Sequence, residues 1–196
     1  MVVFLVRHAS HDELGRVLSG RSDIAINAAG RAEAGRLAKH LAGRLAGTTI
    51  GAIHTSPRQR ARETAAIIAD AHGQSVENAD ELDEIDFGSW SGQPFDALAG
   101  DPAWQEWNAR RGTASTPGGE DMKSATARAV RHIEAAAGDV PLVCVSHCDV
   151  IRGIVAHYLG LDADRLLSFD VDPASLTEIA LHPGGGRVVS INERAL

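Results

Sequence analysis

The amino-terminal segment restricts the fold of this chain more than any other feature. Residues 2–6, VVFLV, are continuously apolar and rich in β-branched side chains. A strand without a polar face is buried on both sides, as the strands of parallel sheets are. The segment therefore predicts a central strand of an α/β protein, and it places Arg7 and His8 directly after that strand.

Strand-like and helix-like patterns alternate along the rest of the chain. Apolar residues at helical spacing between a cap at Asn27 and a stop at Gly47 predict the first helix. Ser56 as cap and Pro57 in the first turn predict the start of a second helix. The predicted strands cover residues 2–6, 50–54, 141–145, 175–181 and 187–191, and the predicted helices cover residues 27–45, 56–71, 121–137 and 149–159. This alternation predicts a three-layer α/β/α sandwich with a mostly parallel central sheet.

The chain has no internal repeat and no linker, so we expect one domain over residues 1–196. Residues 82–119 mix acidic residues, glycine, tryptophan and proline with two short helical pieces. They predict an insertion over the end of the sheet where such folds bind ligands, so that it covers the site. The spacing of Trp104 and Trp107 fits one helix face, which favours a small local core.

Charge and cysteine content narrow the class of protein. The formal net charge of −7 disfavours nucleic acid as a partner, because its binding needs a basic surface. Cys144 and Cys148 are expected to be free thiols. No apolar stretch approaches the roughly 20 residues of a membrane span, and the start lacks the basic region of a signal peptide. We expect a cytoplasmic protein without a nucleic-acid or membrane partner, and leave homodimer formation open.

Residues suited to an anion follow three of the predicted strands. His8 and His147 can face one anionic group if the strands that precede them are neighbours in the sheet. Arg7 and Arg58 add fork-shaped donors that match phosphate oxygens. The helix starts after Ser56 and Ser146 would supply backbone N–H groups. An acidic run over residues 80–86 could provide a proton donor whose pKa is raised by burial.

Each of these features has a structural alternative. A histidine after a strand is more often structural than catalytic, and a helix start with several arginines, or an acidic run, is usually a solvated surface. Residue types and spacing alone therefore predict only an anion site.

Ordered motifs add to this prediction. They are LVRHA at residues 5–9, GRSDIAIN at 20–27, HTSPRQRARETA at 54–65, LDEIDFGSWSG at 82–92, PGGE at 117–120 and VSH at 145–147. In this order, over nearly the whole length, the chain resembles the histidine phosphatase superfamily, also called the phosphoglycerate mutase-like family. The resemblance implies the family's α/β fold and a phosphohistidine intermediate.

The resemblance also implies roles for individual residues. His8 would be the nucleophile, and Glu84 would be the general acid and then the base, with Glu81 as a competing choice. The groups that would hold phosphate or substrate are Arg7, Ser19, Gly20, Arg21, Arg58 and His147. No metal and no cofactor are implied, because the arginines and histidines neutralise the phosphoryl charge.

Four positions depart from the family pattern. Ala9 replaces the signature glycine, Ser10 and His11 replace a usual Glu/Gln-Thr pair, and Cys148 stands where glycine commonly follows the last histidine. These changes surround the expected pocket and bear on the substrate rather than on the chemistry. For His11 we expect an exposed position in a loop, with a position at the mouth of the pocket as the alternative.

The length of the chain and its modest insertion favour the short phosphatases of the family. These include broad-specificity phosphomonoesterases and α-ribazole phosphatase. The predicted function is hydrolysis of small phosphorylated metabolites through phosphohistidine on His8. A phosphoglycerate mutase-type phosphotransferase and a non-catalytic phosphate-binding module are the alternatives, and no dinucleotide-binding glycine motif follows the first strand.

Overall fold

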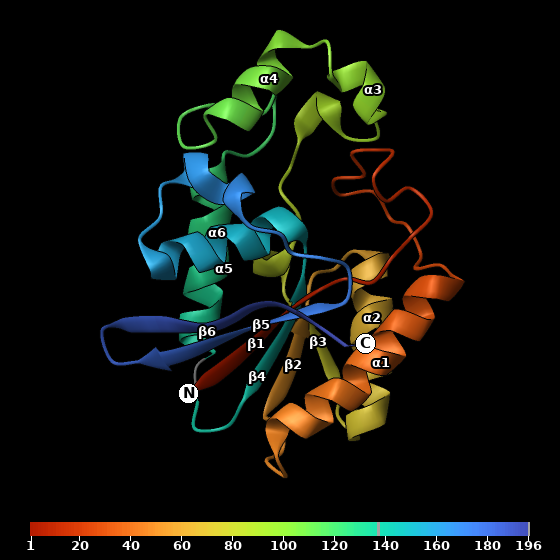
Figure 1. The fold of residues 1–196 in the computed structure, drawn as a ribbon, viewed down its shortest axis with the longest axis vertical. Coiled ribbons are helices and arrows are strands. Elements are labelled where there is room, and N and C mark those ends of the chain that lie inside the picture. Colours follow the sequence, from red (N-terminus) through yellow and green to blue (C-terminus); the bar gives the residue numbers. More distant parts are fainter. Residues whose placement is uncertain (137, 196) are drawn as a thin grey trace.

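The computed structural model describes residues 1–136 and 138–195 and is built around one mixed sheet. The strand order is β3-β2-β4-β1-β5-β6 (Figure 1). Strands β3, β2, β4 and β1 are parallel, whereas β5 runs antiparallel to β1 and β6 antiparallel to β5. The strands are β1 (Val2–Arg7), β2 (Ala52–Thr55), β3 (Val76–Asn78), β4 (Leu142–Ser146), β5 (Ser175–His182) and β6 (Gly185–Arg194).

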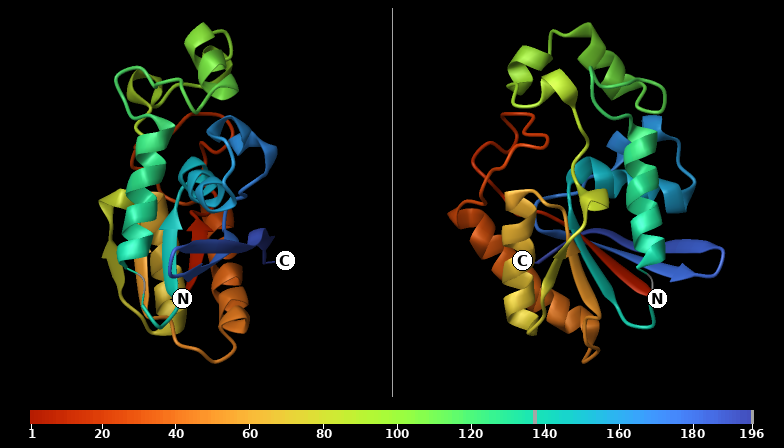
Figure 2. Two further views of the ribbon diagram at one scale, coloured as in Figure 1. Left: turned by 90° about the vertical axis from the view of Figure 1, so that its left-hand side faces the viewer. Right: turned by 180° about the vertical axis from the view of Figure 1, so that it is seen from behind.

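Helices cover both faces of the sheet, which confirms the predicted three-layer architecture (Figures 1 and 2). Helices α1 and α2 pack together on one face, and α5 and α6 on the other. No helix within the described residues is both long and apolar enough to span a membrane. The helices are α1 (Ala28–Leu45), α2 (Gln59–His72), α3 (Phe95–Leu98), α4 (Pro102–Ala109), α5 (Met122–Ala135) and α6 (Cys148–Leu159), with short 3₁₀ helices η1 (Asp80–Leu82), η2 (Gly88–Trp90) and η3 (Ala163–Ser168).

Strand β1 is buried on both faces, as its apolar sequence predicts. Phe4 and Val6 belong to the core under α1 and α2, and Val3 and Leu5 belong to the core under α5 and α6. Each such side chain contributes roughly 1.5–3 kcal/mol through burial. Because β1 is anchored on both sides, the residues at its carboxyl end have a fixed position next to β4.

The structure corrects several predicted boundaries. Helix α2 begins at Gln59 and not at Ser56, and the Ser56 hydroxyl accepts a hydrogen bond from the Arg58 backbone at 3.2 Å just before the helix. Asn27 caps α1 as predicted, but the left-handed stop is Ala46, one residue before Gly47. The short strand β3, mostly exposed, has no counterpart in the prediction. Residue 137, the predicted end of the third helix, lies outside the described residues.

The segment between η1 and α5 places α3 and α4 beyond the carboxyl ends of the parallel strands (Figure 1). Asp101 caps α4 by accepting a hydrogen bond from the Ala103 backbone at 2.8 Å, and it also accepts one from Trp90 Nε1 at 3.0 Å. Trp107 is fully buried and lies edge-on to Phe87. These contacts stabilise the segment as a cover over the end of the sheet.

Candidate active site

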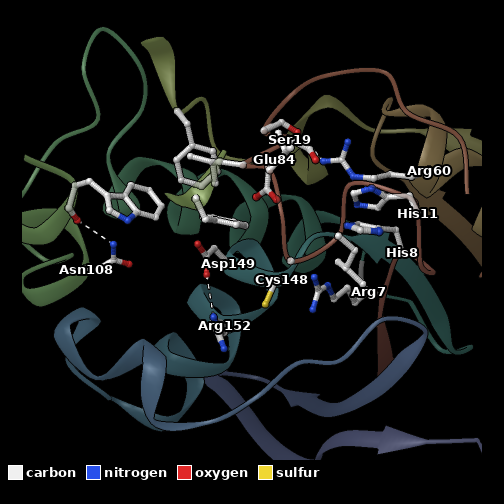
Figure 3. Close-up of a pocket in the computed structure, with 18 of the residues that line it drawn as sticks. Arg7, His8, His11, Ser19, Arg60, Glu84, Asn108, Cys148, Asp149 and Arg152 are labelled. Carbon is white, nitrogen blue, oxygen red and sulfur yellow. Dashed lines mark hydrogen bonds and ion pairs between the residues drawn. The ribbon is translucent and has the colours of Figure 1, made fainter. Parts of the chain in front are cut away.

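A cavity of about 420 Å³ lies at the carboxyl ends of β1 and β4, under the segment that carries α3 and α4. Arg7, His8, His11 and Arg60 gather at one end of it, and Asn108 lies toward the other (Figure 3). The neighbouring strands bring these groups together, since Arg7 in β1 pairs in register with Ser146 in β4.

His8 has a defined proton position. Its Nδ1 lies 3.0 Å from the carbonyl oxygen of Ala9, and a carbonyl can only accept, so Nδ1 donates. Burial, followed by the charges of Arg60 and Arg7, holds the pKa of His8 well below its ordinary value. The ring is therefore neutral, and Nε2 has a free lone pair. This is the state that a nucleophilic histidine requires.

Two guanidinium groups supply positive charge beside His8. Arg7 donates to the carbonyl of Val171 at 2.6 Å. Arg60 is only 1% exposed and donates to the carbonyls of Gly20 and Ser22 at 2.6 and 2.8 Å. Burial lowers the pKa of Arg60 from its ordinary value, yet a guanidinium stays charged in proteins. The pair provides fork-shaped donors for a phosphoryl group.

His147 is fully buried against the same group of side chains. Its ring centroid lies 5.2 Å from that of His8, and its Nδ1 lies 3.1 Å from Arg60. Since a guanidinium only donates, Nδ1 of His147 accepts. Burial is the main cause that holds the pKa of His147 well below its ordinary value, and Arg60 and His8 add to it.

Glu84 is one of two acidic side chains that line the cavity, and Asp149 is the other. Burial, with a further contribution from the charge of Asp149, raises the pKa of Glu84 to about 7. A carboxyl group with this pKa can donate and accept a proton near neutral pH. Glu81 is 52% exposed, lies near His132, and is not part of the cavity wall. Of these two glutamates, only Glu84 lies in the cavity wall, where it can transfer a proton.

Comparison with known proteins shows which family has this arrangement of side chains. The family model described as histidine phosphatase superfamily (branch 1) matches residues 3–194. The chain belongs to the histidine phosphatase superfamily. The matched range includes every residue that lines the cavity.

The relatives of this histidine phosphatase superfamily chain differ in how much of their own length the chain covers. It is 30% identical over 195 residues to a bifunctional protein of Mycobacterium tuberculosis, covering 96% of this chain and 52% of the relative. The chain thus spans about half the length of the first curated relatives it matches. It is 28% identical over 197 residues to phosphoserine phosphatase 1 of Hydrogenobacter thermophilus, covering 97% and 91%. The solved structure of YhfR from Bacillus stearothermophilus superposes with a TM-score of 0.88 at 26% identity, covering 98% and 96%.

The predicted site residues divide into two groups in the structure. Those that line the cavity are Arg7, His8, Ser19, Gly20 and Glu84, and His147 lies directly behind them. Arg58 and Arg21 are not part of the cavity wall. Arg58 donates to Asp83 at 2.9 Å and to the carbonyl of Arg21 at 2.7 Å, while Arg21 donates to the carbonyl of Glu84 at 2.8 Å. These two arginines hold the segment that carries Glu84.

Arg60 is the site residue that the sequence prediction missed. It stands two positions after Arg58, in a helix start that contains several arginines. The buried face of α2 contains Arg60, Thr64 and Ile68, which are spaced four residues apart. This spacing is a signal in the sequence, because residues at i and i+4 share a helix face.

The prediction of an exposed His11 is wrong. Its side chain is 5% exposed, lines the cavity, and has its ring centroid 5.3 Å from that of His8. Burial, followed by the charge of Arg60, lowers the pKa of His11 to about 4. The loop folds inward because the Ser10 side chain and backbone both hydrogen-bond to Glu33 in α1 at 2.9 Å.

Of the other departures from the family pattern, Ala9 is buried and Cys148 is partly buried. Ala9 is fully buried, and its backbone N–H donates to the Thr64 hydroxyl at 3.0 Å. Cys148 lines the cavity, and its thiol points to the carbonyl of Val171 at 3.6 Å. Burial raises the pKa of Cys148 to about 11, so the thiol is protonated at neutral pH.

The far part of the cavity carries a buried ion-pair group. Asp149 pairs with Arg111 at 2.6 Å and with Arg152 at 3.2 Å. Trp104 also lines this part, so it is not simply a core residue as its spacing favoured. Within residues 1–136 and 138–195, no three histidine, cysteine or acidic side chains converge in a way that could hold a metal ion.

The different surroundings of the two arginines lead to a testable prediction. We expect Arg60→Ala to lower kcat/KM for a phosphomonoester by about 10²–10³-fold, as the loss of one preorganised donor to a developing anion does. Arg58→Ala, a matched change two residues away, should cost less than about 10-fold, since Arg58 acts only on the scaffold. Steady-state kinetics of both purified variants tests this, and a larger loss in Arg58→Ala would reverse the assignment.

Proposed function

We propose that this chain is a phosphomonoesterase that hydrolyses small phosphorylated metabolites through phosphohistidine on His8. The observation that carries the proposal is the neutral His8 ring with a free Nε2, next to the buried Arg60 and to Glu84. The name of the phosphoserine phosphatase relative supports the same class of reaction.

In the first half of the proposed reaction, Nε2 of His8 attacks the phosphorus atom. Arg7, Arg60 and His147 hold the equatorial oxygens, whose charge must be neutralised in phosphoryl transfer. The bond between phosphorus and the ester oxygen breaks, and protonated Glu84 gives its proton to that oxygen. The products of this half are the free alcohol, phosphohistidine and the Glu84 carboxylate.

In the second half, Glu84 works as a base. Its carboxylate takes a proton from water, and the water oxygen attacks phosphorus while the bond to Nε2 of His8 breaks. Inorganic phosphate leaves, and both His8 and Glu84 return to their starting protonation states. We further propose that the reaction is of the histidine acid phosphatase type and needs no metal, since Arg7 and Arg60 supply the positive charge.

We propose that residues 1–196 act as one domain, in the cytoplasm, on a small-molecule substrate and without nucleic acid. Arg111 and Trp104 in the far part of the cavity would contact the alcohol part of the substrate.

A panel of phosphorylated metabolites tests the proposed function. It would contain phosphoserine, 3-phosphoglycerate, α-ribazole phosphate and p-nitrophenyl phosphate, with inorganic phosphate and phosphoryl transfer measured together. We expect release of inorganic phosphate from at least one substrate. Transfer between two positions of phosphoglycerate without net hydrolysis would favour the mutase alternative, and binding without turnover would favour a phosphate-binding module.

A further inference from the structure

A chain of hydrogen bonds runs behind His147, away from the cavity. Nε2 of His147 lies 2.7 Å from the hydroxyl oxygen of Ser56, and that hydroxyl lies 3.2 Å from Oδ1 of Asp83. All three side chains are buried. Neither Ser56 nor Asp83 lines the cavity, so neither can touch a substrate there.

The direction of each hydrogen bond in this chain follows from its two ends. Arg60 only donates, so Nδ1 of neutral His147 accepts and its proton is on Nε2. Nε2 therefore donates to the Ser56 oxygen, and the Ser56 hydroxyl donates to the Asp83 carboxylate. The Asp83 charge thus polarises the His147 ring through Ser56.

Asp83 is held in place independently of His147. It accepts hydrogen bonds from Arg58 Nε at 2.9 Å and from the backbone N–H of Glu84 at 2.8 Å. Arg21 Nε lies 3.5 Å from its other oxygen. The carboxylate therefore stays fixed when a ligand enters the cavity.

A phosphoryl dianion changes what His147 must do. Its oxygens only accept, so His147 can hold one through Nδ1 only if Nδ1 carries a proton. We propose that Asp83 and Ser56 are positioning residues that allow His147 to take up one proton when a phosphoryl dianion enters the site. The proton comes from solvent and binds Nδ1, and the Arg60 N–H that was bonded to Nδ1 turns to the phosphoryl group. This inference rests on the proposed function.

Several charged and titratable groups act on His147. They are Arg7 and His8 at the end of β1, Arg60 in α2, Asp83 and Glu84 after η1, and Arg128 in α5. Burial and the neighbouring cations keep the free ring neutral, because they lower its pKa. A dianion beside the ring offsets these cations and favours the charged form.

Proton uptake can be measured by calorimetry with inorganic phosphate. Titrations at about pH 8, where the dianion predominates, would be run in buffers of different ionisation enthalpy. Glu84 also titrates near neutral pH, so all variants carry Glu84→Gln. In this background we expect uptake of about one proton per phosphate bound.

Three further substitutions test which side chains the proton uptake depends on. Ser56→Ala and Asp83→Asn should each reduce the uptake by at least about half, and Ser56→Thr should restore it because the hydroxyl is kept. Thr55→Val is the matched control, since Thr55 is equally buried but its hydroxyl donates to the carbonyl of Ser56 and not to Asp83. It should leave the uptake unchanged.

The outcomes separate this inference from the function it rests on. Phosphate binding without proton uptake in the Glu84→Gln background would overturn the inference and leave the proposed function standing. Uptake that is unchanged in Ser56→Ala would do the same. Absence of phosphate binding in the unmodified protein would overturn both.

Discussion

Replacing His8 with alanine is expected to lower kcat/KM for phosphomonoester hydrolysis by at least about 10⁴-fold. The reason is that Nε2 of His8 is the free nucleophile in the cavity, and alanine leaves no group to form the covalent intermediate. Steady-state kinetics with p-nitrophenyl phosphate provides the measurement. His72→Ala is the control, because His72 bonds to the carbonyl of Ala38 in α1 and lies outside the cavity wall.

Glu84→Gln is expected to act selectively on substrates with poor leaving groups. Glutamine cannot donate a proton, so kcat/KM for an alkyl phosphate should fall by about 10²–10⁴-fold. p-Nitrophenolate leaves without protonation, so kcat/KM for its ester should fall by less than about 10-fold. The ratio kcat/KM is the right quantity because it reports phosphoryl transfer and excludes the later hydrolysis of phosphohistidine. Equal losses for both esters would exclude Glu84 as the general acid.

The protonation state of Glu84 determines the direction in which kcat/KM changes with pH. Burial raises the pKa of Glu84 to about 7, and the acid form is the active one in phosphoryl transfer. For an alkyl phosphate, kcat/KM should therefore be high below about pH 7 and fall as the pH rises through that value. Glu84→Gln should lose this alkaline limb. A limb that persists in the variant would belong to another group.

The sequence predicted the layers of the fold correctly, and it placed the carboxyl ends of β1, β2, β4 and β5 within one residue of the observed ends. Strand β1 made this possible, because a run that is apolar on both faces can only lie inside a sheet covered on both sides. The positions of His8, Arg7 and Glu84 in the cavity wall follow from the same strand order.

The features that the sequence did not predict depend on contacts between distant segments. The Ser56 hydroxyl contacts His147 and Asp83, which lie far from it in the sequence. Arg58 pairs with Asp83, which leaves Arg60 to face the cavity. His11 is buried because its loop is held against α1 by Glu33. Arg60 has a local signal in its helical spacing with Thr64 and Ile68, whereas the contacts of Ser56 and His11 leave no local pattern in the chain.

The central claim is a covalent phosphohistidine on His8, and trapping it is the most direct test. The protein would be mixed with a ³²P-labelled phosphomonoester, denatured within the first turnover in alkali, where phosphohistidine survives, and mapped by peptide. The account predicts label on the peptide that contains His8, lost on mild acid treatment and absent from His8→Ala. Label on His11 or His147, or hydrolysis with no labelled protein under single-turnover conditions, would contradict it.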